Sequence, residues 1–329
     1  IKGDKLIIYS GFFTLTNVVM VWVVIFYSYY SFKETTPRLK IDKAIFKSIF
    51  SYGIWDLYGY CCLTIYDQAR VYFVNKFFGV RYNASVGVAN SIESGVTGIT
   101  NTTARAFSPQ ITKQYAQGNF STMQLVSVNS MRFTILGIGL FSIPVMLNAE
   151  TLIQLWLTVI PPSSPNILRC LLIVSFLGVI TQPFNTAIHS TGKIKAFSVL
   201  SGSLLLVMSG VIYITYALTH NIVAGFSTMI LTQMIYCPIS ATIAKRLIPQ
   251  LSLWLFAKNV LRVLLVIGIS CVPAYLLHSV IALSFLNIVA TTILYASLFL
   301  PLAYTFLISK EERIQLKQII HNKIFFYKK

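Results

Sequence analysis

The sequence predicts an all-α integral membrane protein with about nine transmembrane helices. Of its 329 residues 56% are hydrophobic and only 11% charged, and the mean hydropathy is +0.72, whereas soluble domains carry about 25% charged residues. Apolar runs of about 20 residues recur along nearly the whole chain, which favours helices over the shorter alternating strands of a barrel. The expected spans are 6–31, 48–78, 83–104, 126–148, 167–188, 196–218, 222–244, 260–280 and 284–308.

The basic residues predict the orientation of these helices. The connections on one side of the membrane, together with the tail, hold 19 of the 26 Lys and Arg residues. The connections and span ends on the opposite side hold five, and Arg70 and Arg132 fall within spans. The side that is rich in Lys and Arg is expected to be cytoplasmic, because cytoplasmic loops of membrane proteins carry an excess of these residues. We therefore expect the N-terminus outside and a basic cytoplasmic tail over 310–329. This distribution also explains the formal charge of +17 without nucleic-acid binding.

Several classes of function are disfavoured. No Gly-rich phosphate loop, no HExxH, no GxSxG and no acidic metal cluster occurs in the sequence, so we expect neither an enzyme nor a cofactor or metal. The five cysteines lie in or at the edge of apolar spans, without metal-ligand spacing, and are interpreted as small packing residues. The stretches 39–50 and 316–324 are amphipathic, and each is expected to rest on anionic membrane lipids or to be a solvated linker.

Polar residues within the second span form one stripe. Taken at 100° per residue, Tyr60, Asp67 and Arg70 lie within about 40° of Asp56 on a helix. Ionisable residues are costly in a bilayer and usually face a cavity or a partner. The stripe therefore lines a central cavity in which Arg70 meets an anionic substrate, or it is a self-neutralised Asp67–Arg70 pair that lets the helix pack.

The third span separates a polar face, with Asn90, Glu93, Thr97 and Asn101, from a small-residue face around Gly95 and Gly98. Glu93 is a candidate for coupling to a cation or proton, or it pairs with Arg70 or Arg132 on another helix.

Two further polar features complete the candidate site. Arg132 is expected to extend to the inner interface or to reach the cavity. Gln182, Asn185 and His189 share a stripe at the inner end of the fifth span, where a hydrogen-bonded interface histidine is a commoner interpretation than a ligand.

Five segments resemble a known transporter family. They are VNKFFG (74–79), YNASVGVANSI (82–92), SPQITKQYAQGN (108–119), LWLTVIPP (155–162) and TGKIKAF (191–197). In this order the chain resembles the latter two-thirds of O-antigen and capsule repeat-unit flippases. These belong to the multidrug/oligosaccharidyl-lipid/polysaccharide exporter superfamily, whose members have two six-helix lobes around a cavity.

The resemblance implies a domain plan. Residues 1–32 would be the last helix of a first lobe and 33–47 a cytoplasmic linker. Residues 48–245 would be the complete second lobe, 246–309 two additional helices and 310–329 the tail. The chain has no initiator Met, and about five first-lobe helices would be missing partners.

The resemblance also implies a cargo. The expected function is to flip a polyprenyl-diphosphate-linked oligosaccharide across a bacterial inner membrane for surface polysaccharide synthesis. One alternative is a multidrug cation antiporter of the same fold, which the acidic residues Asp56, Asp67 and Glu93 favour. Another is a non-transporting scaffold or remnant.

Overall fold

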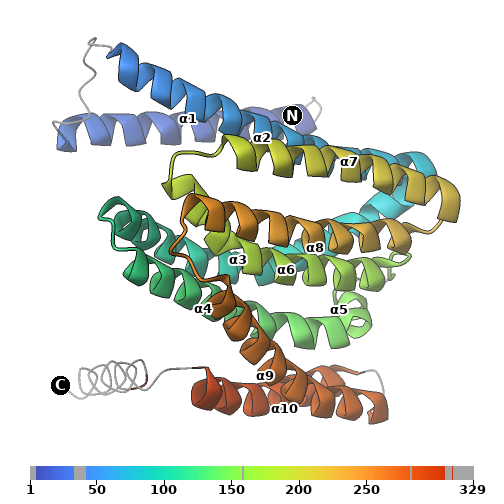
Figure 1. The fold of residues 1–329 in the computed structure, drawn as a ribbon. Coiled ribbons are helices and arrows are strands. Elements are labelled where there is room, and N and C mark those ends of the chain that lie inside the picture. Colours follow the sequence, from blue (N-terminus) through green and yellow to red (C-terminus); the bar gives the residue numbers. More distant parts are fainter. Residues whose placement is uncertain (1–4, 33–41, 158, 282–283, 308–312, 314–329) are drawn as a thin grey trace, which may run out of the picture. The chain divides into compact units, whose positions relative to one another are not determined.

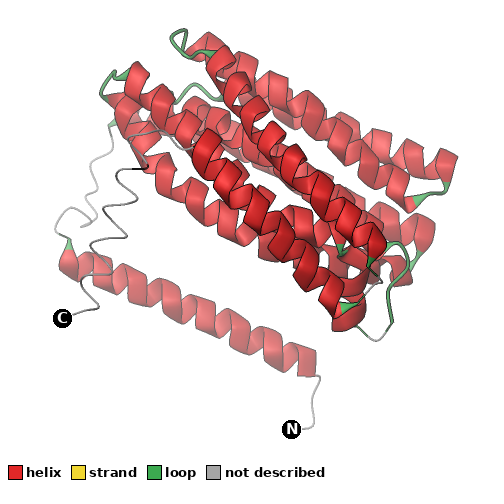
Figure 2. Cartoon of the chain, turned by 90° about the horizontal axis from the view of Figure 1, so that it is seen from below, coloured by secondary structure: helices red, strands yellow, loops and turns green. Residues whose placement is uncertain are grey.

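The computed structural model describes residues 5–32, 42–157, 159–281, 284–307 and 313. All elements in this part of the chain are helices, joined by short connections (Figures 1 and 2). The all-α prediction is confirmed. The described chain divides into two compact units, with the boundary after Phe50, and each is described by itself. The predicted tail (310–329) and most of the predicted linker (33–47) lie outside the described residues.

The first unit contains α1 (Lys5–Ser31) and the beginning of α2 (Lys43–Phe78). The carboxylate of Asp42 accepts a hydrogen bond from the backbone N–H of Ala44 at 2.8 Å, which satisfies a donor at the start of the helix. Because α2 is continuous, the last residues of the predicted linker belong to the same helix as the second predicted span.

The second unit is a bundle formed by the rest of α2 and eight further helices. Six are long and follow in order: α3 (Val80–Ala116), α4 (Phe120–Leu147), α6 (Ser164–Ser190), α7 (Lys195–Thr219), α8 (Ile222–Leu247) and α9 (Leu253–Val280). The seventh long helix is α10 (Phe285–Phe306), and α5 (Ala149–Trp156) is a short helix between α4 and α6. Helix α6 packs against α3, α4 and α8, and α7 packs against α8. The last two helices, α9 and α10, pack on each other and on α4.

Among the described residues, seven helices are long and apolar enough to cross a membrane: α1, α4, α6, α7, α8, α9 and α10. The chain is therefore a multi-pass membrane protein. Helices α2 and α3 have 36 and 37 residues but are more polar. At a rise of about 1.5 Å per residue, α3 is nearly twice as long as a hydrocarbon core of about 30 Å. The two polar helices are also those that carry most of the predicted site residues.

Several predicted helix ends differ from the structure. The third span was expected to end at 104, but α3 continues through Pro109 to Ala116. Pro109 has no backbone N–H, so the carbonyl of Arg105, four residues earlier, loses its helical partner. The Ser108 hydroxyl donates to the carbonyl of Ala104, the residue before Arg105, at 3.2 Å. Helices α4 and α9 begin about six residues earlier than predicted. The expected loop after the fourth span contains α5, which an Arg169–Glu150 ion pair of 3.4 Å links to α6.

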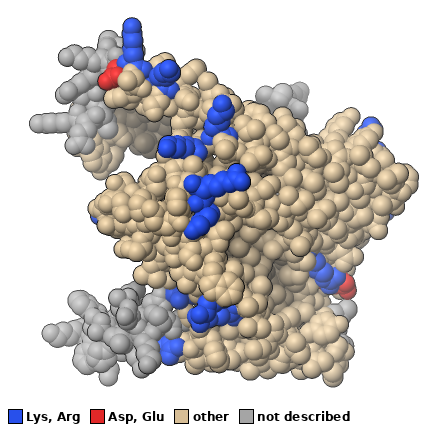
Figure 3. Space-filling view, viewed as in Figure 1, with Lys and Arg blue, Asp and Glu red and all other residues tan. Residues whose placement is uncertain are grey.

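Basic side chains are unevenly distributed over the surface. On the second unit, as seen in Figure 3, several Lys and Arg side chains lie toward the left of the view, and one basic side chain lies beside an acidic one at the right. Lys193 and Lys195 join α6 to α7, and Lys245 and Arg246 end α8. The asymmetry agrees with the one-sided pattern in the sequence. The assignment of this side to the cytoplasm stays a prediction.

Candidate functional site

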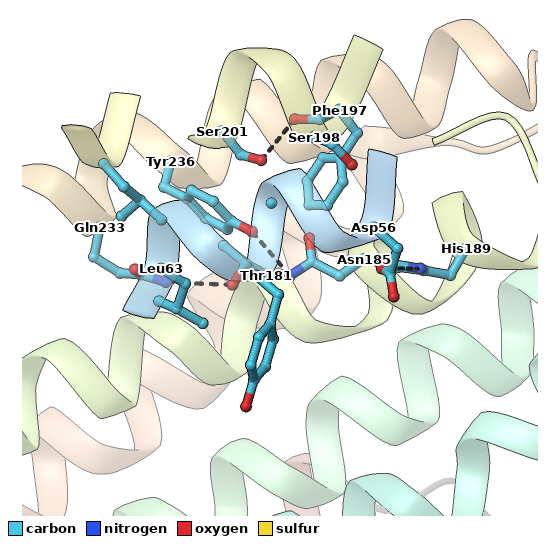
Figure 4. Close-up of a pocket in the computed structure, with 13 residues that line it drawn as sticks. Asp56, Leu63, Thr181, Asn185, His189, Phe197, Ser198, Ser201, Gln233 and Tyr236 are labelled. Carbon is cyan, nitrogen blue, oxygen red and sulfur yellow. Dashed lines mark hydrogen bonds and ion pairs between the residues drawn. The ribbon is translucent and has the colours of Figure 1, made fainter. Parts of the chain in front are cut away.

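A pocket of about 350 Å³ lies between α2, α6, α7 and α8 (Figure 4). We call it the Asp56 pocket. Most of its lining consists of neutral hydroxyl and amide side chains: Tyr60, Thr181, Asn185, Ser198, Ser201, Gln233 and Tyr236. Asp56 and His189 are its ionisable members besides the tyrosines, and Gly59, Leu63, Phe197 and Leu205 complete it. No Lys or Arg lines it within the described chain.

Small residues bring α2 close to α7 along one wall of this pocket. A Cβ at Gly59 would lie 3.6 Å from the Ser198 hydroxyl, and a Cβ at Gly202 would lie 2.9 Å from the Tyr58 ring. The Tyr58 hydroxyl lies 3.2 Å from the Ser203 hydroxyl, within hydrogen-bonding distance. Backbones approach closely where side chains are small. Side chains of α2 and α7 therefore meet at these two glycines.

Hydrogen bonds join α6 to α8 across the pocket. The amide of Gln233 donates to the Thr181 hydroxyl at 3.3 Å, and the amide of Asn185 donates to the Tyr236 hydroxyl at 3.4 Å. Figure 4 shows these side chains converging from the two helices. The buried Asn185 Oδ1 has no hydrogen-bond partner. Buried polar atoms are usually paired, so this oxygen is an acceptor available to a ligand once the pocket widens.

At one end of the pocket, α2 and α6 meet through three polar side chains. The Tyr52 hydroxyl lies 2.8 Å from His189 Nδ1. A carboxylate oxygen of Asp56 lies 3.9 Å from the same nitrogen. The prediction that His189 is a hydrogen-bonded residue between helices is confirmed, but its ring also faces the pocket.

A second pocket of about 290 Å³ lies between α3 and α6. We call it the Glu93 pocket, and its lining consists of Glu93, Thr97, Thr100, Asn101, Ser175, Gly178, Val179, Gln182 and Asn185. The Ser175 hydroxyl donates to the Glu93 carboxylate. Neither arginine that we considered as a partner of Glu93 lies within 4 Å of it. Asn185 belongs to both pockets, so α6 is the wall that they share.

The structure thus brings half of the predicted site residues to a pocket. Asp56 and Tyr60 line the Asp56 pocket, and Glu93 and Asn101 line the Glu93 pocket. Asn90 is half-buried on α3 and lines neither. On the small-residue face of the same helix, a Cβ at Gly95 or Gly98 would meet nothing within 4 Å.

Asp67 and Arg70 do not form the ion pair that their spacing allows. The Arg70 guanidinium lies 3.6 Å from the Met229 sulfur and 5.9 Å from the Phe226 ring centre, both on α8, and its buried Nε has no hydrogen-bond partner. Neither Asp67 nor Arg70 lines either pocket. The Arg70 side chain lies against α8, whereas Asp67 is half-buried and has no Lys or Arg of the described chain within 4 Å.

Arg132 is buried in α4 with 8% of its surface exposed, and its guanidinium lies 5.2 Å from the Phe133 ring centre. Its extension to the inner interface stays a prediction. The helix α4 packs against α3, α6, α9 and α10, and this packing encloses the side chain. Arg132 lines neither pocket.

Five polar residues that line the Asp56 pocket were not predicted from the sequence. Thr181 comes from α6, Ser198 and Ser201 come from α7, and Gln233 and Tyr236 come from α8. On α7 and on α8 the two residues are three positions apart, which places both on one helix face. This spacing is a weak signal, because isolated serines and tyrosines are common in apolar helices.

Residues 57–214 match the MatE family model. The match begins within α2, ends within α7 and includes α3, α6 and most of the lining of both pockets. No curated protein and no solved structure matches the chain.

The MatE match agrees with the coarser part of the resemblance. MatE domains belong to transporters of the superfamily that the sequence segments indicated. The match therefore favours membrane transport over catalysis. It does not distinguish a flippase for lipid-linked sugars from a cation antiporter.

Proposed function

We propose that this chain takes part in flipping a lipid-linked oligosaccharide, a sugar joined to a polyprenyl carrier through diphosphate, across a bacterial inner membrane. The observation that carries the proposal is the lining of the Asp56 pocket. Seven neutral hydroxyl and amide side chains surround it, together with the aromatic rings of Tyr60, Phe197 and Tyr236. In our domain plan the pocket belongs to a six-helix lobe over 48–245, followed by two additional helices.

This lining suits a sugar for a physical reason. A sugar leaving water gives up hydrogen bonds from many hydroxyl groups, and each polar group left unpaired costs about 1–3 kcal/mol. Neutral side chains that both donate and accept replace those bonds without fixing a charge in the site. The flat faces of aromatic rings can cover the apolar C–H faces of the sugar. The Arg70 role in holding the diphosphate stays a prediction, and its position against α8 gives it no support.

A multidrug cation antiporter is the second candidate, and one observation favours it. Each pocket contains one carboxylate, Asp56 or Glu93, and no Lys or Arg lines either pocket within the described chain. Carboxylates in a water-poor site attract a cation. In that case Glu93, held by Ser175, would bind the coupling cation or proton.

The test uses cells whose gene for this chain carries Gln233→Leu. Gln233 lines the Asp56 pocket and bonds to Thr181, so its loss should lower surface polysaccharide about tenfold, the equivalent of one or two hydrogen bonds. The lipid-linked precursor should accumulate. Gln154→Leu is the matched control, because Gln154 is exposed on α5 and lines neither pocket.

Protein levels are measured in each strain, so that loss of folding is separated from loss of transport. Wild-type polysaccharide in a strain deleted for the gene would reject the flippase proposal. If the deletion strain is instead hypersensitive to lipophilic cations, the antiporter is supported.

A further inference from the structure

The end of the Asp56 pocket holds a histidine between a hydroxyl and a carboxylate. Tyr52 and Asp56 come from α2, one helical turn apart, and His189 comes from the last turn of α6. Both the phenolic oxygen, at 2.8 Å, and the carboxylate oxygen, at 3.9 Å, face the same ring nitrogen, Nδ1. The two helices meet here through side chains that can exchange protons.

We propose that Tyr52, Asp56 and His189 form a proton-binding site that sets the charge of the Asp56 pocket. The inference rests on the proposed transport function, and it names how that function is coupled to protons. It applies to either candidate cargo.

The hydrogen bonds define two states of the site. In the neutral ring with an unprotonated Nδ1, the Tyr52 hydroxyl donates to that nitrogen. A proton taken from water in the pocket converts Nδ1 into a donor, the Tyr52 hydroxyl turns to accept, and the Asp56 carboxylate becomes the ionic partner of the ring. The same proton returns to water when the ring is neutral again.

Side-chain exposure permits this exchange. The His189 side chain is 38% exposed and that of Asp56 is 55% exposed, so the described residues leave both groups open to the pocket. The separation of 3.9 Å is too long for a hydrogen bond and short enough for an ion pair. A small rotation of Asp56 about its side-chain bonds would close the gap, and the carboxylate would then turn toward the ring.

Other helices contribute few groups that compete for the proton. Helix α7 presents the Phe197 ring, 6.0 Å from the imidazole centre. Helix α8 contributes Tyr236 to the pocket, where it accepts from Asn185. Helix α3 contacts the end of α6 through Thr112 and Ser190, whose hydroxyls lie 3.0 Å apart and do not titrate.

The other charged side chains near α6 do not line the Asp56 pocket. Lys195 of α7 lies 4.7 Å over the ring of Trp55, the residue before Asp56, and Lys193 is exposed in the connection between α6 and α7. Glu93 of α3 accepts from Ser175 and lines the Glu93 pocket, and the buried Arg132 of α4 lines neither pocket. Glu150 of α5 pairs with Arg169, which is 20 residues, or about 30 Å of helix, from His189. His189 and Asp56 therefore determine the pocket's charge.

One proton then changes what the pocket attracts. With a neutral ring the pocket holds the net negative charge of Asp56, which repels a diphosphate and attracts a cation. With a protonated ring the two charges cancel, and an anionic cargo no longer meets repulsion. Protonation should therefore favour an anionic cargo and disfavour a cationic one, so the two candidate cargoes predict opposite responses to pH.

The first test needs no cargo. The full chain with isotope-labelled histidine is titrated by NMR in detergent, and the His189 ring signal is assigned by its absence from His189→Gln. The pH midpoint of this signal should change by about one unit in Asp56→Asn and should also change in Tyr52→Phe. It should stay the same in His278→Gln, since His278 lies on α9 beside Asn287. An equal midpoint in wild type, Asp56→Asn and Tyr52→Phe would overturn the site.

The second test measures binding of two probes, a polyprenyl diphosphate and tetraphenylphosphonium, at pH 5.5 and 8. Relative to His189→Gln, the wild type should gain about tenfold in affinity for the anionic probe at the acid pH, the effect of one nearby unit charge. For the cation, the wild type should bind about tenfold more weakly than His189→Gln at the acid pH and equally well at the alkaline pH. Identical pH dependence in wild type and His189→Gln would reject the charge control. If the polyprenyl diphosphate binds at neither pH, the proposed cargo fails, while the NMR titration still decides the proton site.

Discussion

Replacing Gly225 by alanine should destabilise the protein, although alanine is the better helix former. Gly225 is buried in the first turn of α8 and faces Tyr216 in the last turn of α7. The two helices are joined only by His220, with φ 47°, and Asn221. This short turn presses α8 against the fully buried Tyr216 ring.

The expected magnitude follows from the distances. An alanine Cβ would lie 1.9 Å from Tyr216 Cε1 and 2.3 Å from Cζ, whereas ordinary contacts begin at 3.4 Å. The ring would have to move by the difference, 1.5 Å, but Phe78 packs on it with 5.1 Å between ring centres. Such overpacking costs up to about 3 kcal/mol, and the helix propensity of alanine returns about 1 kcal/mol. We expect a net loss of about 2 kcal/mol.

The assay is reversible unfolding of the purified chain in mixed micelles titrated with SDS. Gly210→Ala is the matched control, because Gly210 is exposed on α7 and a Cβ there would meet nothing within 4 Å. That control should gain up to about 1 kcal/mol from helix propensity. Adding Tyr216→Leu to Gly225→Ala should cost less than the two single changes together, because leucine lacks the clashing ring atoms. A Gly225→Ala variant as stable as Gly210→Ala would refute the reasoning.

Two further predictions concern other contacts. Arg70→Met should leave the free energy of unfolding unchanged or raise it, because the guanidinium has no ion-pair partner within 4 Å among the described residues and lies against Met229 and Phe226. SDS unfolding checks this, and lost transport at a normal protein level would restore the predicted diphosphate role. Tyr295→Phe should cost about 1 kcal/mol, because the buried hydroxyl donates to the Gly139 carbonyl at 3.0 Å and links α10 to α4; an unchanged free energy of unfolding would contradict it, and Tyr275→Phe, at an exposed site on α9, is the control.

The sequence predicted the fold class and the order of the long helices, because apolar runs of membrane-crossing length are an unambiguous signal. Their ends were predicted less well. Hydropathy shows where polar residues begin, at Arg105 for example, but helical hydrogen bonding continues past Pro109 to Ala116. The eight residues of α5 were taken as a loop, since a short helix bounded by Trp156 and a proline-rich segment has no apolar run of its own.

The candidate site was predicted in part for a different reason. Helical spacing placed Asp56, Tyr60 and Arg70 on one stripe, and the first two do line a pocket. Spacing within one helix cannot show which neighbour lies opposite each turn, so the contact of Arg70 with α8 was not foreseeable. Gln233 was missed because its importance comes from a partner on α6, 52 residues earlier in the chain.

The position of Asn185 has a mechanical consequence. Thr181 faces the Asp56 pocket, the next residue, Gln182, faces the Glu93 pocket, and Asn185 borders both. Helix α6 is thus a partition one helix thick, with α8 on one side and α3 on the other. A displacement of this helix toward α3 enlarges one compartment by shrinking the other. The two compartments cannot both expand through a movement of α6, so a cargo that widens one leaves less room for an occupant of the other.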